Sequence, residues 1–295
     1  MPLHFGVAGG CLLYVLSCIA FWYNNRDGWF GSSETVPYLL GGGLVLFFGL
    51  CIGFRLISWR TIHKETIVVA VSSIVLLTVL WEYGRRDSFH FWFGQVDVSH
   101  PMAPLFPFYF FVASAVCLRM MVPLLLARLT LGRSPLDYGY GFHGVLRYTW
   151  IYVVTLLVAI PLVMYAATLP SFLQKYPLCK QIITANTLSV SSFVLYQLAY
   201  SLVFASGESF WRGYMLFGLH RQLGANALFF MVIPYVISHF GKPWPETLGA
   251  VFTGLFLGSL ALAHRSFWLG VATHWGVALS MDIFAIRGRM VEWVP

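Results

Sequence analysis

Four ionisable side chains in the last third of the chain lie within long apolar segments and could carry out acid–base chemistry. Glu208 and Arg212 occur in GESFWRGYMLFGL, His239 occurs in PYVISHFGKPWPE, and His274 occurs in GVATHWGVALSMD. A charged side chain at the depth of a bilayer is costly unless it is paired or hydrated, so residues of this kind are candidates for a functional site.

The residue types and their spacing favour hydrolysis. Glu208 and Arg212 are four residues apart, which places them one turn apart on the same face of a helix. Arg212 could therefore orient the Glu208 carboxylate, or the two could form a buried ion pair that only locks the helix. Histidine exchanges protons near neutral pH, and a glutamate beside a histidine can deprotonate water. We predict Glu208, His239 and His274 as the catalytic residues.

Two further carboxylates, with Arg212, are predicted to support this site. Glu246 follows Pro245 at the expected start of a span, where a helix N-terminus favours an acid in any case. Asp282 follows His274 by about two helical turns and could orient either His274 or Arg212.

Two histidines and one acid also offer the ligands of a catalytic zinc site, although no HExxH motif occurs. A metal-dependent hydrolase is therefore an alternative, and our main prediction involves no metal and no cofactor.

The elements that must position these residues are membrane-spanning helices. The chain of 295 residues is 59% hydrophobic and only 10% charged, whereas a soluble domain is about 25% charged. Apolar stretches of about 20 residues, long enough to cross a bilayer core, recur throughout. We predict an all-α, polytopic transmembrane helix bundle of about eight to nine spans. The candidates are residues 5–23, 37–58, 67–83, 104–127, 148–169, 187–219, 224–240, 246–263 and 266–286.

The sixth candidate span is unusually long. Residues 187–219 would reach about 50 Å as one helix, so we expect it to be tilted, broken or partly outside the membrane, with Gly207 as a kink point. We divide the chain into N-terminal helices (1–186, about five spans), a core that carries the candidate site (187–286) and a C-terminal tail (287–295).

The net charge of +7 does not indicate nucleic-acid binding. The 18 Lys and Arg residues are spread over the loops and form no basic stripe, so they are expected to set membrane topology. We predict a multi-pass protein of the cell (inner) membrane, with the bilayer as its environment and a cytoplasmic N-terminus. The five cysteines are expected to be buried as small hydrophobic residues. The cytoplasmic N-terminus is predicted from a slight excess of cations in the loops on that side of the membrane. These cations are Arg55, Arg60, Lys64, Arg128, Arg133 and Arg147.

Three short motifs in the last third resemble those of a known family. They are Gly207-Glu208-Ser209-Phe210-Trp211-Arg212, Tyr235-Val236-Ile237-Ser238-His239 and His274-Trp275-Gly276-Val277-Ala278. Their order resembles the Glu-Glu-x-x-x-Arg, Phe-x-x-x-His and His-x-x-x-Asn motifs of the CPBP family, which contains CAAX prenyl endopeptidases and bacteriocin-processing or self-immunity proteins. The resemblance implies an intramembrane endopeptidase acting on a peptide or membrane protein that can carry a lipid. In this family the first Glu and the second-motif His activate water, and the third motif stabilises the oxyanion.

Two positions depart from the family pattern. Gly207 stands where the family has its first Glu, and Ala278 stands where it has Asn. Loss of one oxyanion donor costs about 10²–10³ in rate at a working site. Glu208 could act as the base itself, or Glu246 or Asp282 could compensate. Otherwise the chain is a catalytically inactive membrane scaffold or immunity protein. A transporter is disfavoured because no internal repeat is visible.

Overall fold

The computed structural model describes residues 1–25, 32–94, 103–142, 144–184, 187–289 and 292–294, and the chain in these ranges is almost entirely helical. The prediction of an all-α, polytopic bundle is confirmed. Part of the predicted C-terminal tail, residues 290–291 and 295, lies outside the described residues. The division at residues 187 and 287 stays a prediction.

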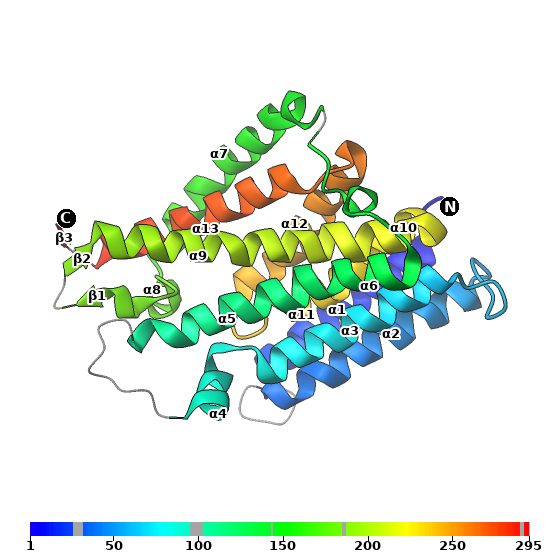
Figure 1. Cartoon of the computed structure of the whole chain (residues 1–295), viewed down its shortest axis with the longest axis horizontal. Coiled ribbons are helices and arrows are strands. Elements are labelled where there is room, and N and C mark those ends of the chain that lie inside the picture. The colour runs from blue at the N-terminus through cyan, green and yellow to red at the C-terminus, as the bar shows by residue number, and fades with distance from the viewer. Residues whose placement is uncertain (26–31, 95–102, 143, 185–186, 290–291, 295) are drawn as a thin grey trace. The chain divides into compact units, whose positions relative to one another are not determined.

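Figure 1 shows the helices along the chain. They form two compact units, each assembled from separate segments. Unit 1 comprises Met1–Trp81, Leu118–Gly141 and Ser209–Phe267, and unit 2 comprises Glu82–Cys117, Phe142–Glu208 and Trp268–Pro295. Ser209 therefore begins a segment of unit 1 directly after Glu208 ends a segment of unit 2.

Unit 1 is built around a buried helix, α11. Every residue of α11 except Leu228 is buried, as expected for a helix that is hydrophobic on all sides. It packs against α1, α2 and α12 and against the helical segment η9 (Ser209–Phe217). The helices of this unit are α1 (Phe5–Asn24), α2 (Val36–Gly53), α3 (Lys64–Tyr83), α6 (Val122–Leu131), α10 (Gly218–Leu223), α11 (Ala227–Ile237) and α12 (Trp244–His264), with the shorter η2 (Ser33–Thr35), η6 (Pro135–Tyr138) and η10 (Gly224–Asn226).

Unit 2 is organised by three long helices. Helix α13 packs against α7 and α9, and α9 also packs against α5. Its helices are α4 (Phe89–Phe93), α5 (Phe106–Val116), α7 (Thr149–Ala166), α8 (Pro170–Lys175), α9 (Val190–Glu208) and α13 (Trp268–Gly288), with the shorter η3 (Arg86–Ser88), η4 (Ala103–Leu105), η7 (Val145–Tyr148) and η8 (Lys180–Ile182). A small sheet, not expected from the sequence, joins the start of α9 to the chain beyond α13. Strand β2 (Thr187–Ser189) pairs antiparallel with β1 (Ile183–Thr184) and parallel with β3 (Glu292–Val294).

The long sixth segment is interrupted as the sequence analysis expected, but in a different way. Instead of a kink at Gly207, regular α-helix ends at Glu208 and a π-helical segment, η9 (Ser209–Phe217), follows. A second π-helical segment, η5 (Cys117–Met121), joins α5 to α6. Segments of this type are rare and are frequently found at functional sites.

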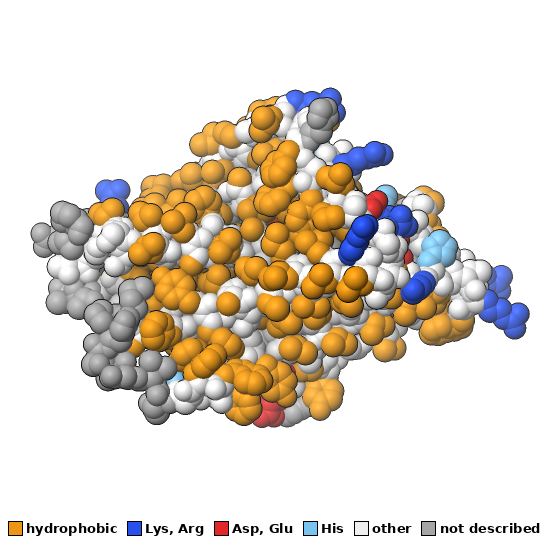
Figure 2. Space-filling model, in the orientation of Figure 1, with side chains coloured by type: hydrophobic (Ala, Val, Ile, Leu, Met, Phe, Trp, Pro, Cys, Tyr) orange, Lys and Arg blue, Asp and Glu red, His pale blue; other side chains and the backbone are white. Residues whose placement is uncertain are grey.

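Eight helices among the described residues are long and apolar enough to cross a membrane. The sixth and seventh candidate spans belong to one helical run, Val190–Ile237, which turns at Gly224, where φ is +56°. In Figure 2, hydrophobic side chains cover the middle of the helices on the face in view, as a lipid-facing surface requires. The chain is therefore an integral, multi-pass membrane protein.

One cysteine differs from the prediction. Cys11, Cys18, Cys51 and Cys179 are buried, but Cys117 is exposed on the π-helical segment η5. This segment lies within an apolar span, so hydrophobicity alone did not distinguish a side chain that faces the core from one that faces outward.

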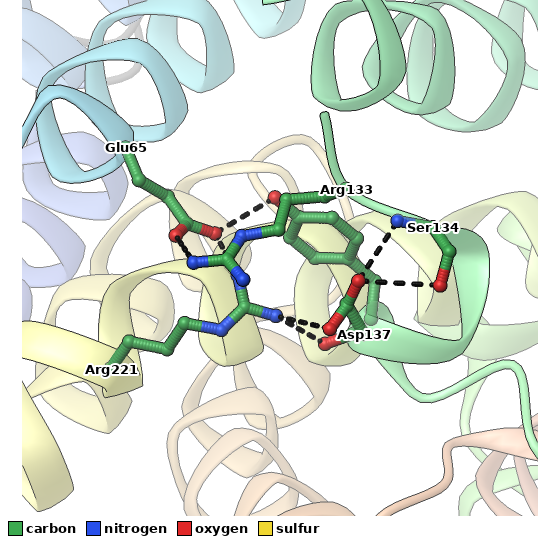
Figure 3. A network of polar contacts seen from close by, with 6 residues as sticks. Glu65, Arg133, Ser134, Asp137 and Arg221 are labelled. Atoms are coloured by element: carbon green, nitrogen blue, oxygen red, sulfur yellow. Dashed lines mark hydrogen bonds and ion pairs between the residues drawn. The ribbon is translucent and has the colours of Figure 1, made fainter. Parts of the chain in front are cut away.

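A polar cluster ties three segments of unit 1 together beside the start of α3 (Figure 3). The Glu65 carboxylate accepts hydrogen bonds from Tyr138 Oη (2.9 Å) and Arg133 Nη2 (3.0 Å), and it also pairs with Arg221. Arg221 donates to the Asp137 carbonyl oxygen at 2.9 Å. The cluster thus joins α3, the segment after α6, and α10.

Candidate active site

Glu208 lies at the C-terminal end of α9 in unit 2, and its side chain is 1% exposed. Its Oε1 atom lies 3.0 Å from Nδ1 of His274 on α13. The His274 side chain is 26% exposed, and its ring packs on Phe204 with centroids 4.8 Å apart. The structure thus brings together two of the three predicted catalytic residues, as a buried carboxylate and a more accessible imidazole.

The Glu208–His274 contact determines which nitrogen of His274 can take up a proton. A carboxylate accepts hydrogen bonds, so Nδ1 is the nitrogen that carries hydrogen when Glu208 is ionised. In the neutral imidazole, Nε2 then has the free lone pair. This is the tautomer that a general base requires when a carboxylate holds its other nitrogen.

Gly270 is a site residue that the sequence analysis missed. It precedes His274 by one turn of α13, and a Cβ atom at this position would lie 2.9 Å from Oε2 of Glu208. Carbon and oxygen atoms do not normally approach so closely without a bond. The absence of a side chain at Gly270 therefore lets the Glu208 carboxylate lie against α13. A glycine one turn before the motif histidine was the available signal in the sequence.

Asp282 is completely buried on α13 and accepts three hydrogen bonds. Its donors are Tyr196 Oη at 2.7 Å, Gln197 Nε2 at 2.8 Å and the backbone nitrogen of Leu178 at 3.1 Å. Gln197 Oε1 in turn accepts a hydrogen bond from Trp275 Nε1 at 3.2 Å. These contacts join α9, α13 and the segment before β1, and the predicted supporting role of Asp282 towards His274 or Arg212 stays a prediction.

Two polar contacts fix the register of α9 against α13. Gln197, near the start of α9, meets Asp282, near the end of α13, whereas Glu208 at the end of α9 meets His274. The helices are therefore antiparallel. The aspartate contacts lie about 16 Å along α9 from Glu208, at 1.5 Å per residue.

Arg212 is fully buried in the π-helical segment of unit 1. Its Nη2 atom donates to the Thr253 carbonyl oxygen at 3.3 Å, and its guanidinium carbon lies 4.3 Å from the centre of the Tyr235 ring. A cation over an aromatic face is attracted by the ring quadrupole, and the attraction is stronger where water is excluded. The expected pairing of Arg212 with Glu208 stays a prediction.

His239 lies just after α11 in unit 1 and is 9% exposed. Its Nδ1 atom lies 2.8 Å from the Tyr235 carbonyl oxygen, and its backbone oxygen accepts a hydrogen bond from Thr247 Oγ1 at 2.9 Å. A carbonyl oxygen only accepts, so Nδ1 carries hydrogen and Nε2 has the lone pair in the neutral ring. The His239 ring meets the Tyr235 ring edge-on at 4.7 Å.

Tyr235 links the two predicted residues of unit 1. Its backbone oxygen holds His239, its ring covers Arg212, and its hydroxyl lies 3.5 Å from Thr253 Oγ1. In the sequence, Tyr235 stands out only as the first position of the second motif. The structure gives it contacts that the phenylalanine of the family pattern could only partly make.

Glu246 has an identified partner. It lies in the first turn of α12, and its Oε1 atom lies 2.5 Å from Nζ of Lys242, four residues earlier. This contact and the position at a helix N-terminus both stabilise the acid. Its predicted supporting role stays a prediction.

The two departures from the family pattern are both buried within unit 2. Gly207 lies in the last turn of α9. Ala278 is 5% exposed and belongs to an apolar cluster that contains Tyr196, Tyr200 and Ile286. Among the described residues, no group of three or more His, Cys, Asp or Glu side chains could hold a metal ion.

Comparison with known proteins finds one family model that matches part of the chain. The family model of the type II CAAX prenyl endopeptidase Rce1-like proteins matches residues 189–280, the segment that contains all three motifs. No curated protein and no solved structure matches the chain. The matched segment begins one residue before α9 and includes Glu208, His239 and His274. This match is consistent with a CPBP-family protein.

Proposed function

We propose that this protein is an intramembrane endopeptidase in which Glu208 holds His274 as the proton acceptor. The observation that supports the proposal is the 3.0 Å contact between Glu208 Oε1 and His274 Nδ1, together with the deeper burial of the carboxylate. A buried acid that accepts the Nδ1 hydrogen orients the imidazole and stabilises its protonated form.

The proposed reaction is hydrolysis of a peptide bond. His274 Nε2 takes a proton from water while the water oxygen attacks the peptide carbonyl carbon. The tetrahedral intermediate then collapses, the carbon–nitrogen bond breaks, and the imidazolium returns its proton to the departing amine. In the sequence Glu208 is a candidate base, whereas its contact with Nδ1 of His274 supports His274 as the base and Glu208 as the residue that orients it.

His239 is proposed to assist the same reaction. Its match to the second-motif histidine and its neutral tautomer, with a lone pair on Nε2, support this role. Arg212 and Tyr235 are proposed to hold the His239 segment, because both contact this part of unit 1. Glu246 and Asp282 are proposed as supporting residues.

The proposed substrate is a peptide or membrane protein with a lipid attached near the cleaved bond. The match to the type II CAAX prenyl endopeptidase family model supports this class. An apolar helical protein can admit a lipid chain from the side, and the lipid would hold the peptide at the depth of the site. We propose the cell (inner) membrane as its location.

The test uses the intact protein in detergent or nanodiscs and a farnesylated CAAX peptide with a fluorophore and a quencher. We expect Glu208→Gln and His274→Gln each to lower kcat/KM by about 10²–10⁴, the usual contribution of general acid–base catalysis. Glu82→Gln and His90→Gln are matched controls, because both residues are exposed and lie outside the motifs in the same unit. Wild-type rates in the two site variants would exclude the proposed mechanism.

A catalytically inactive scaffold or immunity protein is the second candidate function. The burial of Ala278 among aromatic and aliphatic side chains supports it, because the family pattern has an oxyanion donor there. This alternative expects no turnover of the peptide by wild type, while Glu208→Gln still weakens capture of a partner by the intact protein. Turnover that depends on Glu208 and His274 would eliminate it.

A further inference from the structure

The connection between α2 and α3 forms a pocket lined with cationic, hydroxyl and aromatic side chains. The pocket has a volume of about 480 Å³ and lies wholly within residues of unit 1. Its lining residues are Ile52, Arg55, Leu56, Ile57, Ser58, Trp59 and Thr61. In Figure 1 this connection extends beyond the ends of α2 and α3, and Figure 2 shows basic side chains at the same place.

The backbone around the pocket is well defined by hydrogen bonds. Arg55 adopts a left-handed conformation, with φ of 57°, and the nitrogen of Leu56 donates to the Cys51 carbonyl oxygen at 2.8 Å. Ser58 and Thr61 close a turn, because the Thr61 nitrogen donates to the Ser58 carbonyl oxygen at 3.0 Å. Their hydroxyl oxygens lie 3.1 Å apart. The pocket wall is therefore held in place by the loop itself.

Two cations of this connection have no acidic partner within the described part of the chain: Arg55, which lines the pocket, and Arg60, which lies between the lining residues Trp59 and Thr61. Arg55 and Arg60 are exposed, and no described residue forms an ion pair with either of them. The nearest acid in sequence, Glu65, is already paired with Arg133 and Arg221. A guanidinium without a carboxylate partner is available to bind a phosphate through two parallel hydrogen bonds.

The pocket also lies at a connection where a chain that crosses a bilayer twice would emerge from it. It joins two helices that are each long and apolar enough to span a bilayer. Trp59 is 74% exposed beside the two arginines. Tryptophan prefers the boundary between lipid headgroups and acyl chains, and exposed basic residues near a span attract anionic lipids.

We propose that this pocket binds the phosphate group of an anionic phospholipid. Arg55 and Arg60 contact the phosphate, the hydroxyls of Ser58 and Thr61 line the headgroup site, and the Trp59 ring lies against the start of the acyl chains. Free phosphate offers the same charge without the lipid chain. The lipid is favoured because the pocket combines the cations with an exposed tryptophan and apolar side chains.

The experiment measures lipid retention by native mass spectrometry of the delipidated full-length protein. The probes are phosphatidylglycerol and phosphatidylcholine with identical acyl chains. We expect wild type to retain phosphatidylglycerol preferentially, and Arg55→Gln combined with Arg60→Gln to weaken this binding about tenfold or more, as loss of a charge-assisted hydrogen bond implies. Arg55→Lys should retain an amount of phosphatidylglycerol between those of wild type and the double variant, because lysine keeps the charge but not the bidentate geometry.

Arg265→Gln is the matched control. Arg265 is also exposed and left-handed, with φ of 54°, and it follows helix α12 in the same unit without lining the pocket. It should leave phosphatidylglycerol retention unchanged. Wild-type retention in the double variant, or an equal loss in the control, would overturn the proposal.

Two further measurements distinguish the lipid from the free ion. Excess sodium phosphate should leave most phosphatidylglycerol bound. If phosphate instead displaced all of the lipid and the mass spectrum showed a protein–phosphate adduct, the pocket would bind only the ion and the lipid site would be refuted. Trp59→Ala should lower retention of both lipids, because the ring contacts parts that they share. Unchanged retention in Trp59→Ala would also count against the proposed lipid site.

Discussion

The Glu208 carboxylate lies 3.0 Å from the His274 imidazole, and the two side chains differ greatly in exposure. Because Gly270 leaves room beside Glu208 Oε2, the acid can lie directly against the helix that carries the histidine. This difference in exposure fits the proposed mechanism, in which buried Glu208 orients the imidazole and the more accessible His274 exchanges protons.

We predict that Gly270→Ala lowers the proposed peptidase activity without weakening the fold. The new Cβ would displace the carboxylate, and a misplacement of about 1 Å at an active site can cost about 10²-fold in rate. Alanine is a better helix former than glycine by about 1 kcal/mol, so helix propensity does not oppose folding. The measurement is kcat/KM for the farnesylated peptide, with thermal unfolding measured in parallel.

The control for this substitution is Gly249→Ala. Gly249 lies within α12, and a Cβ atom there would meet nothing within 4 Å. It should retain wild-type activity. Equal kcat/KM values for Gly270→Ala and Gly249→Ala would show that the close approach at Gly270 is not needed.

Glu65→Gln is expected to destabilise unit 1. Glu65 accepts hydrogen bonds from Tyr138 and two arginines, and its side chain is only 12% exposed. Hydrogen bonds to charged groups contribute about 1.5–3 kcal/mol, but partial exposure of both arginines places the expected loss at about 1–2 kcal/mol. Thermal unfolding in detergent should show a lower midpoint, whereas Glu34→Gln at an exposed site without a described ion pair should leave it unchanged. A midpoint equal to that of wild type would show that the cluster is not stabilising.

Asp137 should make the stability of the same cluster depend on pH. Its Oδ2 atom accepts hydrogen bonds from the Ser134 nitrogen and hydroxyl at 2.9 and 3.2 Å, and its Oδ1 atom lies 3.5 Å from Arg221 Nη2. The backbone hydrogen bond from Ser134 is the main cause that lowers the pKa of Asp137 below its usual 3.8. Because the pKa of Asp137 is lower in the folded state, ionised Asp137 contributes its full stabilisation of the fold above the unfolded-state pKa. This stabilisation is lost as pH falls through the folded-state pKa.

The measurement for Asp137 is the difference in unfolding midpoint between wild type and Asp137→Asn across pH. The difference should be constant near neutral pH and should shrink below pH 3.8. A difference that grows on acidification would have the wrong sign for a lowered pKa.

Cys179 should report on the buried Asp282 contacts. Burial raises the pKa of the Cys179 thiol to about 11, so little thiolate exists at neutral pH and alkylation of the folded protein should be slow. Leu178, the adjacent residue, donates its backbone hydrogen to Asp282. Asp282→Ala removes that acceptor, so it should accelerate alkylation at Cys179, as measured by peptide mass spectrometry.

Asp282→Asn provides a graded comparison, because an amide keeps one acceptor oxygen. It should give an intermediate alkylation rate, while Asp87→Asn at an exposed site should match wild type. An unchanged rate in Asp282→Ala would show that the aspartate does not hold the segment around Cys179.

The sequence predicted the helical membrane fold, and related observations marked Glu208 and His274 as candidate site residues, but the sequence did not predict the contact between them. Long apolar stretches have few structural solutions in a bilayer, and an ionisable residue within one needs a partner. The short sheet was missed because its strands contain only two or three residues each, too few for a periodic pattern.

Other features depend on contacts that spacing alone does not encode. In the sequence, Gly270 does not differ from other glycines of membrane helices. Its importance follows only from the position of Glu208 on α9 beside it. Tyr235 looked like an ordinary aromatic core residue, although its carbonyl oxygen and its ring contact different site residues. The contacts of Asp282 with Tyr196 and Gln197 join residues more than 80 positions apart in the chain.

The π-helical segment Ser209–Phe217 makes this region unusually sensitive to insertions and deletions. A π-helix forms its hydrogen bonds five residues apart instead of four, so deletion of one residue can convert part of the segment to α-helix. One residue of α-helix corresponds to a rotation of about 100°. A deletion that was not absorbed by such a conversion would change the angular phase of the residues that follow it, even if no motif residue were removed. The length of this segment is therefore itself a constraint, separate from the identity of the residues within it.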